Sequence, residues 1–228
     1  YCFIDSNIQV NVSPPGGVLT VDGVSSQFFN PAFSGTGYHL VAYTFGTGNC
    51  AETVDYVVFV REKLLSNAYS TDDSICFGNI ATIGVDASGG IGNYSFSWDN
   101  GLSNSFQHIV IPTTTTNYLV NVSDGCSDVT IDTIEVFVHP TFNLNFITSL
   151  KQCYGENGFA KVNVMPVGDY TYLWNNTPSS KIDSIFSLVN RNYQVIVTDN
   201  ITGCFIKDTV SIPGYGNIVA YFSPNKTE

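Results

Sequence analysis

The chain has 228 residues, of which 43% are hydrophobic and 14% are aromatic, so it can build a packed core and is not disordered. Only 12% of the residues are charged, against about 25% in an average globular protein, and the polar remainder is rich in Ser, Thr, Asn and Gly, which suits strands and turns. The formal net charge of −11 argues against a nucleic-acid partner, because such binding depends on Lys and Arg that neutralise phosphates.

The first predicted module covers residues 1–62. Alternating aromatic residues at Tyr43 and Phe45 lead into a Gly-containing turn at Cys50, and residues 54–60 follow as a last strand. The longest purely apolar run of the chain lies in that strand, at residues 57–60, and is far too short to span a bilayer. The sequence therefore predicts no membrane insertion.

The second predicted module covers residues 63–140. In its main segments every second side chain is apolar or aromatic, which places those side chains on one face of each strand. The segments are residues 81–85, 94–98 and 118–122, and Gly and Asn turns separate them.

The third predicted module covers residues 141–213 and repeats this pattern. A strand through Ala160, Val162 and Val164 precedes the aromatic strand 170–174, and the alternating strand 193–199 follows. Residues 214–228 are expected to form a linker or the first strand of a further module.

The six cysteines are spaced evenly and predict one disulfide in each module. Within neighbouring pairs the cysteines lie 48, 50 and 51 residues apart. Many connectivities are open to six cysteines, but the near-constant spacing favours sequential pairing, in which each repeat closes its own bridge. A bridge over roughly 50 residues contributes about 4 kcal/mol in chain-entropy estimates. The predicted pairs are Cys2–Cys50, Cys76–Cys126 and Cys153–Cys204.

Short strands, Gly/Pro/Asn/Asp turns and the absence of helical periodicity predict an all-β chain of three tandem immunoglobulin-like antiparallel β-sandwich modules. Trp98 and Trp174 lie 22 and 21 residues after Cys76 and Cys153 and alternate in phase with the core positions, so we expect both indoles to be buried rather than to form a carbohydrate platform. Each bridge is expected at one rim of its sandwich. Six cysteines also indicate an oxidising compartment, and we expect a fragment of a longer exported protein whose signal peptide lies elsewhere.

The third module resembles the SprB-type repeat of gliding-motility surface proteins in bacteria that use type IX secretion. The matching elements are C-x-G at residues 153–155, the strand YTYLW at 170–174, and Y-x-V-x-V-T-D at 193–199 before Gly203-Cys204. The second module is similar to the PKD-like modules of the same proteins, through residues 112–118 and 123–126. The first resembles a companion module through residues 15–17, 23–25 and 29–37, and residues 218–224 resemble the opening strand of a further PKD domain.

This resemblance implies export to the bacterial cell surface and a repeat segment of a large adhesin or filament that acts as a stalk or spacer. The partners it implies are neighbouring modules of the same chain, with surface glycans or proteins as further candidates. The alternatives are a module that recognises glycan or protein through the loops at one sandwich end, and an accessory domain of an extracellular hydrolase. A fold alone does not decide among these functions.

No motif in the sequence predicts an enzyme or a cofactor. The histidines, His39, His108 and His139, have no second His or Cys at metal-ligand spacing, and no Gly-x-Ser-x-Gly elbow is present. The sequence predicts no zinc site. Calcium is the remaining candidate metal because it binds carboxylates, but Asp also favours turns through bonds to its own backbone. The calcium candidates are Asp72, Asp73, Asp99, Asp124 and Asp199.

The resemblance also implies O-glycans at Asp-Ser/Thr-apolar triplets. Such triplets are loose, and those with Thr also look like ordinary strand edges. The candidate acceptors are Ser74, Thr133, Ser184 and Thr209.

Overall fold

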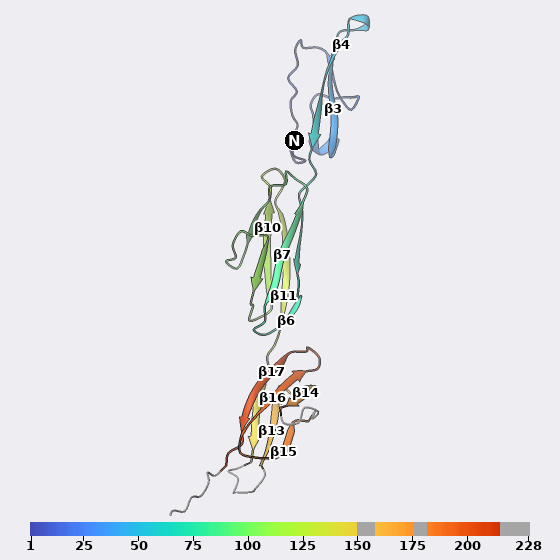
Figure 1. Cartoon of the computed structure of the whole chain (residues 1–228). Coiled ribbons are helices and arrows are strands. Elements are labelled where there is room, and N and C mark those ends of the chain that lie inside the picture. Colours follow the sequence, from blue (N-terminus) through green and yellow to red (C-terminus); the bar gives the residue numbers. More distant parts are fainter. Residues whose placement is uncertain (150–157, 176–181, 215–228) are drawn as a thin grey trace, which may run out of the picture. The chain divides into compact units, whose positions relative to one another are not determined.

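The computed structural model describes residues 1–149, 158–175 and 182–214, and within these ranges the chain is almost entirely β (Figure 1). Apart from β6 beside β11, the neighbouring strands of every sheet pair antiparallel, and the only helical pieces in these ranges are α1 (Pro31–Ser34) and a 3-10 turn (Gly48–Cys50). The predicted all-β class is thus confirmed. The chain divides into two compact units, Tyr1–Val138 and His139–Glu228.

Residues 1–62 contain one four-stranded sheet, in the order β2-β1-β3-β4. Asp22 and Gly23, both with positive φ, form the tight turn between β1 and β2, as an Asp-Gly pair favours. The prediction of a two-sheet sandwich is wrong here, because the Pro- and Gly-rich residues before Val18 make a single isolated bridge, Ile8 to Phe29, instead of a strand ladder. The strands are β1 (Val18–Val21), β2 (Val24–Ser25), β3 (Gly37–Phe45) and β4 (Glu52–Val60).

Residues 63–139 form a sandwich of two sheets, with strand orders β5-β7-β9 and β6-β11-β10-β8. Numbered within the module, the first, third and fifth strands make one sheet and the second, seventh, sixth and fourth make the other, which is an immunoglobulin-like arrangement. The strands are β5 (Leu65–Ser70), β6 (Ser74–Cys76), β7 (Ala81–Ser88), β8 (Ser95–Trp98), β9 (Gln107–Val110), β10 (Thr116–Ser123) and β11 (Thr130–His139).

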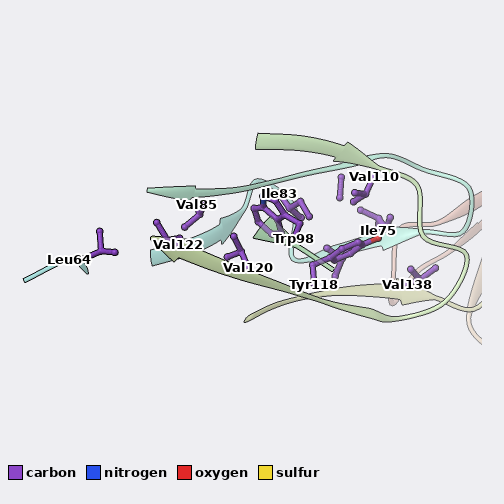
Figure 2. Packing of buried hydrophobic residues seen from close by; sticks show 12 residues of the cluster. Leu64, Ile75, Ile83, Val85, Trp98, Val110, Tyr118, Val120, Val122 and Val138 are labelled. Atoms are coloured by element: carbon purple, nitrogen blue, oxygen red, sulfur yellow. The ribbon is translucent and has the colours of Figure 1, made fainter. Parts of the chain in front are cut away.

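The core of this sandwich collects the alternating side chains predicted from the sequence (Figure 2). On β10, Tyr118, Val120 and Val122 are buried while the residues between them are not. Ile83 on β7 is fully buried from the opposite sheet. Apolar side chains from both sheets therefore fill one interior, which is what makes two layers adhere.

Residues 139–214 build a second sandwich on the same plan, with sheets β12-β13-β15 and β14-β16-β17. Trp174 at the end of β14 is fully buried and Trp98 at the end of β8 nearly so, which confirms the predicted burial of both indoles. Trp98 Nε1 donates to Ser105 O at 2.7 Å, and Trp174 Nε1 donates to Ile182 O at 3.1 Å. The strands are β12 (Asn143–Thr148), β13 (Gly158–Met165), β14 (Tyr170–Trp174), β15 (Ser184–Leu188), β16 (Asn192–Asp199) and β17 (Phe205–Ser211).

The predicted module boundaries stay predictions. The two compact units meet at Val138 and His139, while the boundary expected after residue 62 lies inside the first unit. Separate buried clusters surround Val41, Val120 and Trp174, one in each predicted module. Residues 215–228 lie outside the described part of the chain.

Candidate functional site: the Cys2–Cys126 bridge

The N-terminal residues lie along the last strand of the first sheet. The Tyr1 amino group donates to Phe59 O at 2.8 Å, and Arg61 N donates to Tyr1 O at 3.0 Å. The Asp5 carboxylate accepts from Cys2 N at 2.8 Å, and Asp5 N donates back to Cys2 O at 3.1 Å. These four bonds hold Cys2 beside the end of β4.

The other half of the bridge lies in the β10–β11 hairpin, which the buried Asp124 shapes. Its Oδ1 accepts from Cys126 N at 2.9 Å and from Ser127 N at 2.7 Å, while its Oδ2 accepts from Ile91 N at 2.9 Å. Burial raises the pKa of Asp124, but the N–H donors of Ser127, Cys126 and Ile91 outweigh that effect and leave the pKa below its usual value. An ionised carboxylate therefore fixes the loop that carries Cys126.

A disulfide joins Cys2 to Cys126, with their Cα atoms 5.4 Å apart. It links the first sheet to the sandwich that follows, across 124 residues of sequence. Close to it, Lys63 Nζ lies 4.5 Å from the centroid of the Phe3 ring, and Gly90 N donates to Glu62 O at 3.0 Å. Residues 1–62 are thus tied to the residues that follow by a covalent bond, a cation–π contact and a backbone hydrogen bond.

The bridge overturns two of the predicted pairs, Cys2–Cys50 and Cys76–Cys126. Cys50 is an exposed free thiol, and Cys76 and Cys204 are both disulfide-bonded. Cys153, and with it the predicted Cys153–Cys204 pair, lies outside the described residues.

Strand length explains the error. Cys2 lies beside Phe59 near the end of β4, whereas Cys50 precedes Glu52 at its start. At about 3.3 Å per residue these strand positions are roughly 23 Å apart, while a disulfide needs Cα atoms within about 7 Å. Cys76 and Cys126 have the same problem. The backbone carbonyl of Asp73 accepts from Phe137 N late in β11, whereas Cys126 precedes the start of that strand. The predicted bridges Cys2–Cys50 and Cys76–Cys126 are therefore geometrically excluded.

The calcium candidates are not brought together. Among the residues that the structure describes, no three His, Cys, Asp or Glu side chains lie close enough to hold a metal ion. Asp99 accepts from Leu119 N at 3.0 Å on the neighbouring β10. Asp199 accepts from Ile201 N at 2.8 Å and Thr202 N at 3.2 Å, as a turn-forming carboxylate does. Asp72 and Asp73 are exposed at the bend before β6.

The candidate glycosylation sites differ in accessibility. Ser74, Thr133 and Thr209 are exposed on strand faces, whereas Ser184 is half-buried and its hydroxyl donates to Asp183 at 2.5 Å. Modification needs an accessible hydroxyl, so the first three remain the better candidates. Their occupancy stays a prediction.

Sequence reasoning missed a polar cluster around His39. This buried ring lies between two acceptors, with Nδ1 2.7 Å from Asp22 Oδ2 and Nε2 2.9 Å from Gly35 O. The hydrogen bond from His39 and a second one from Leu40 N lower the pKa of Asp22. Asp22 also forms the β1–β2 turn, so the cluster fastens that turn to β3. The signal in the sequence was the Asp22-Gly23 pair, which marks a hairpin turn.

No protein-family model and no curated protein matches the chain. Among solved structures, the titin I-band fragment I67–I69 is 8% identical, covers 92% of this chain and 97% of its own, and has a TM-score of 0.40. The eight N-terminal Ig domains of Down syndrome cell adhesion molecule are 11% identical, over 80% of this chain and 27% of that one, with a TM-score of 0.36. Extracellular domains 3–5 of Drosophila OTK are 10% identical over 86% of this chain and 85% of that one, with a TM-score of 0.32.

At identities and TM-scores this low, these likenesses carry no argument about function, and the immunoglobulin-like assignment rests on the strand orders given above. No helix among the described residues is long and apolar enough to cross a membrane.

Proposed function

We propose that the chain is a stalk or spacer segment of a large secreted bacterial surface adhesin or filament, and not an enzyme. The Cys2–Cys126 bridge is the observation that supports this proposal most directly. The resemblance of residues 153–204 to SprB-type repeats and of residues 112–126 to PKD-like modules supports the bacterial surface context. Neighbouring modules of the same polypeptide are the first partners.

The bridge suits a segment under tension because of where it enters and leaves the chain. A pull on residue 1 passes through Cys2 and the disulfide to Cys126, and then along β11 toward residue 139. Residues 3–125 lie inside the closed loop, so the distance between residues 1 and 126 is limited by the disulfide and not by these residues. Shear can therefore not lengthen this part of the chain even if its cores open.

Single-molecule stretching between the two ends of the chain tests this role. A fully extended loop of 124 residues would add about 430 Å, at roughly 3.5 Å per residue. We expect at least this added length after complete reduction, which also opens the disulfide of Cys76, and not in the oxidised protein. The double variant Cys2→Ser/Cys126→Ser should extend further than the oxidised wild type without reductant. Equal extension before and after reduction would refute the spacer mechanism.

Recognition by loops is the second candidate, and one cavity favours it. A cavity of about 570 Å³ opens beside the β1–β2 turn, and the Phe33 side chain at its rim is 92% exposed. Aromatic rims beside amide groups suit glycan binding. Its polar lining includes Asn7, Asp22 and Asn30. Reproducible binding of a defined glycan on an array, lost in Phe33→Ala and kept in the exposed-site control Phe205→Ala, would favour this candidate over a pure spacer.

A further inference from the structure

The second cysteine of every predicted module occupies the same place in the fold. Cys50 lies between β3 and β4, Cys126 between β10 and β11, and Cys204 between β16 and β17. Each of these strand pairs is an antiparallel hairpin formed by the last two strands of its module. The three cysteines are therefore equivalent by topology, although the sheet of residues 1–62 lacks a second layer.

Two of the three hairpin cysteines are oxidised. Cys126 is bonded to Cys2, and Cys204 is also in a disulfide. Cys50 is the exception among the described cysteines, since it is exposed and has a free thiol. Because Cys126 and Cys204 are bonded at the equivalent position, we expect Cys50 to have a disulfide partner too, in a part of the parent protein outside this segment.

The cysteines on the opposite side of the bridge are also equivalent. Cys2 follows Tyr1, which pairs with the end of β4, and Cys76 ends β6, which lies next to β11. Both flank the last strand of their own module, and both are disulfide-bonded. In the one bridge whose two partners are defined, the flanking cysteine belongs to the earlier module and the hairpin cysteine to the later one.

We propose that Cys50 accepts a disulfide from the flanking cysteine of an immunoglobulin-like module that precedes Tyr1 in the parent polypeptide. Cys50 would then be bonded to that preceding module in the same way that Cys126 is bonded to residues 1–62. This deepens the proposed spacer function, on which it rests, because staggered bridges would carry tension from module to module. The exposed hairpin at Gly48–Cys50 leaves the sulfur open to such a partner.

The bond forms by thiol–disulfide exchange with a protein disulfide oxidant. The thiols of Cys50 and of the flanking cysteine together lose two electrons and two protons as their S–S bond forms. The oxidant's disulfide takes up both electrons and both protons and becomes a dithiol.

Thiol labelling and non-reducing peptide mapping of the full parent protein test the proposal. In the isolated chain 1–228, maleimide should label Cys50, and a Cys50→Ser variant should lose that label. In the oxidised parent protein Cys50 should resist labelling. Its peptide should be found linked to a peptide that precedes Tyr1 and contains a cysteine.

Three results would overturn it: a free Cys50 thiol in the oxidised parent, a Cys50–Cys50 bond between two copies, or a bond from Cys50 to a cysteine of residues 1–228. None of these would contradict the stretching result, which compares the intact Cys2–Cys126 bridge with its serine variant and does not involve Cys50. A failed stretching test with a correctly linked Cys50 would conversely reject the mechanical role and leave the bridge pattern standing.

Discussion

Asp124 shows how one buried carboxylate positions a covalent bond. Its two oxygens accept three backbone N–H groups, two from its own hairpin and one from Ile91 in the loop after β7. Gly90 beside that loop has φ of +57°, and a Cβ there would collide with the Asp124 carboxylate, so only glycine fits. The sequence run Ser88-Gly89-Gly90 thus serves the hairpin that carries Cys126.

We predict that Asp124→Asn lowers the free energy of unfolding of the unit Tyr1–Val138 by roughly 1–3 kcal/mol at pH 7, because an amide offers one acceptor oxygen where the carboxylate offers two. Urea titrations followed by tryptophan fluorescence measure the difference. Asp128→Asn, an exposed change in the same hairpin, is the matched control and should have little effect. An equally stable Asp124→Asn protein would show that the carboxylate is dispensable.

The lowered pKa of Asp124 also predicts a pH dependence. A carboxyl whose pKa is lower in the folded than in the unfolded state contributes stability above its unfolded pKa of about 3.9, and this contribution is lost as the pH falls through the folded value. The gap in stability between wild type and Asp124→Asn should therefore be widest near neutral pH and shrink below about pH 4. A gap that grows on acidification would contradict this assignment.

At the scale of strands, the period-two pattern was sufficient to predict the cores. Tyr118, Val120 and Val122 point inward as their alternation requires, and Trp98 and Trp174 are buried at the ends of equivalent strands. This works because each strand has one face on a core and one in water.

Other features could not be read from the sequence. Cysteine pairing depends on which strand ends lie together, and equal spacing along the chain says nothing about that distance. The single sheet of residues 1–62 was missed because Cys2 and Cys50 suggested a complete module, while residues 3–17 supply no strand.

The two faces of one sheet give a matched test of the β5–β7–β9 layer. We predict that Ile83→Ala on β7, which empties a fully buried site, costs about 2–5 kcal/mol. Ile109→Ala on the neighbouring β9 removes a side chain that is 69% exposed and should cost little. Urea denaturation measures the free energy of unfolding of both variants. Similar decreases would contradict the assignment of Ile83 to the buried face and Ile109 to the exposed face of this sheet.

At the scale of the whole molecule, the disulfide compensates for a small core. Only Phe29, Val41 and Val60 are fully packed in the first cluster, far fewer than in either sandwich. Closing a loop of 124 residues contributes about 5 kcal/mol in chain-entropy estimates. Residues 1–62 should therefore depend on the bridge more than the sandwiches do.

We predict that Cys2→Ser/Cys126→Ser loosens residues 1–62 first. Amide hydrogen exchange should accelerate in β3 and β4, while β16 and β17, whose core contains neither cysteine, serve as the internal reference. Unchanged protection in β3 and β4 would show that the three-residue core suffices without the bridge.

The distance between Cys2 and Cys126 also sets an order of events during biogenesis. Cys2 leaves the ribosome long before Cys126. In an unstructured chain Cys50 competes with Cys126 for the bond to Cys2, because the shorter loop closes at a lower entropic cost. Once the β3–β4 hairpin forms, it carries Cys50 to the far end of β4 and removes that competitor. If oxidation is faster than formation of this hairpin, Cys2 becomes bonded to Cys50 instead of Cys126. Correct maturation therefore requires the β3–β4 hairpin to form before the disulfide does.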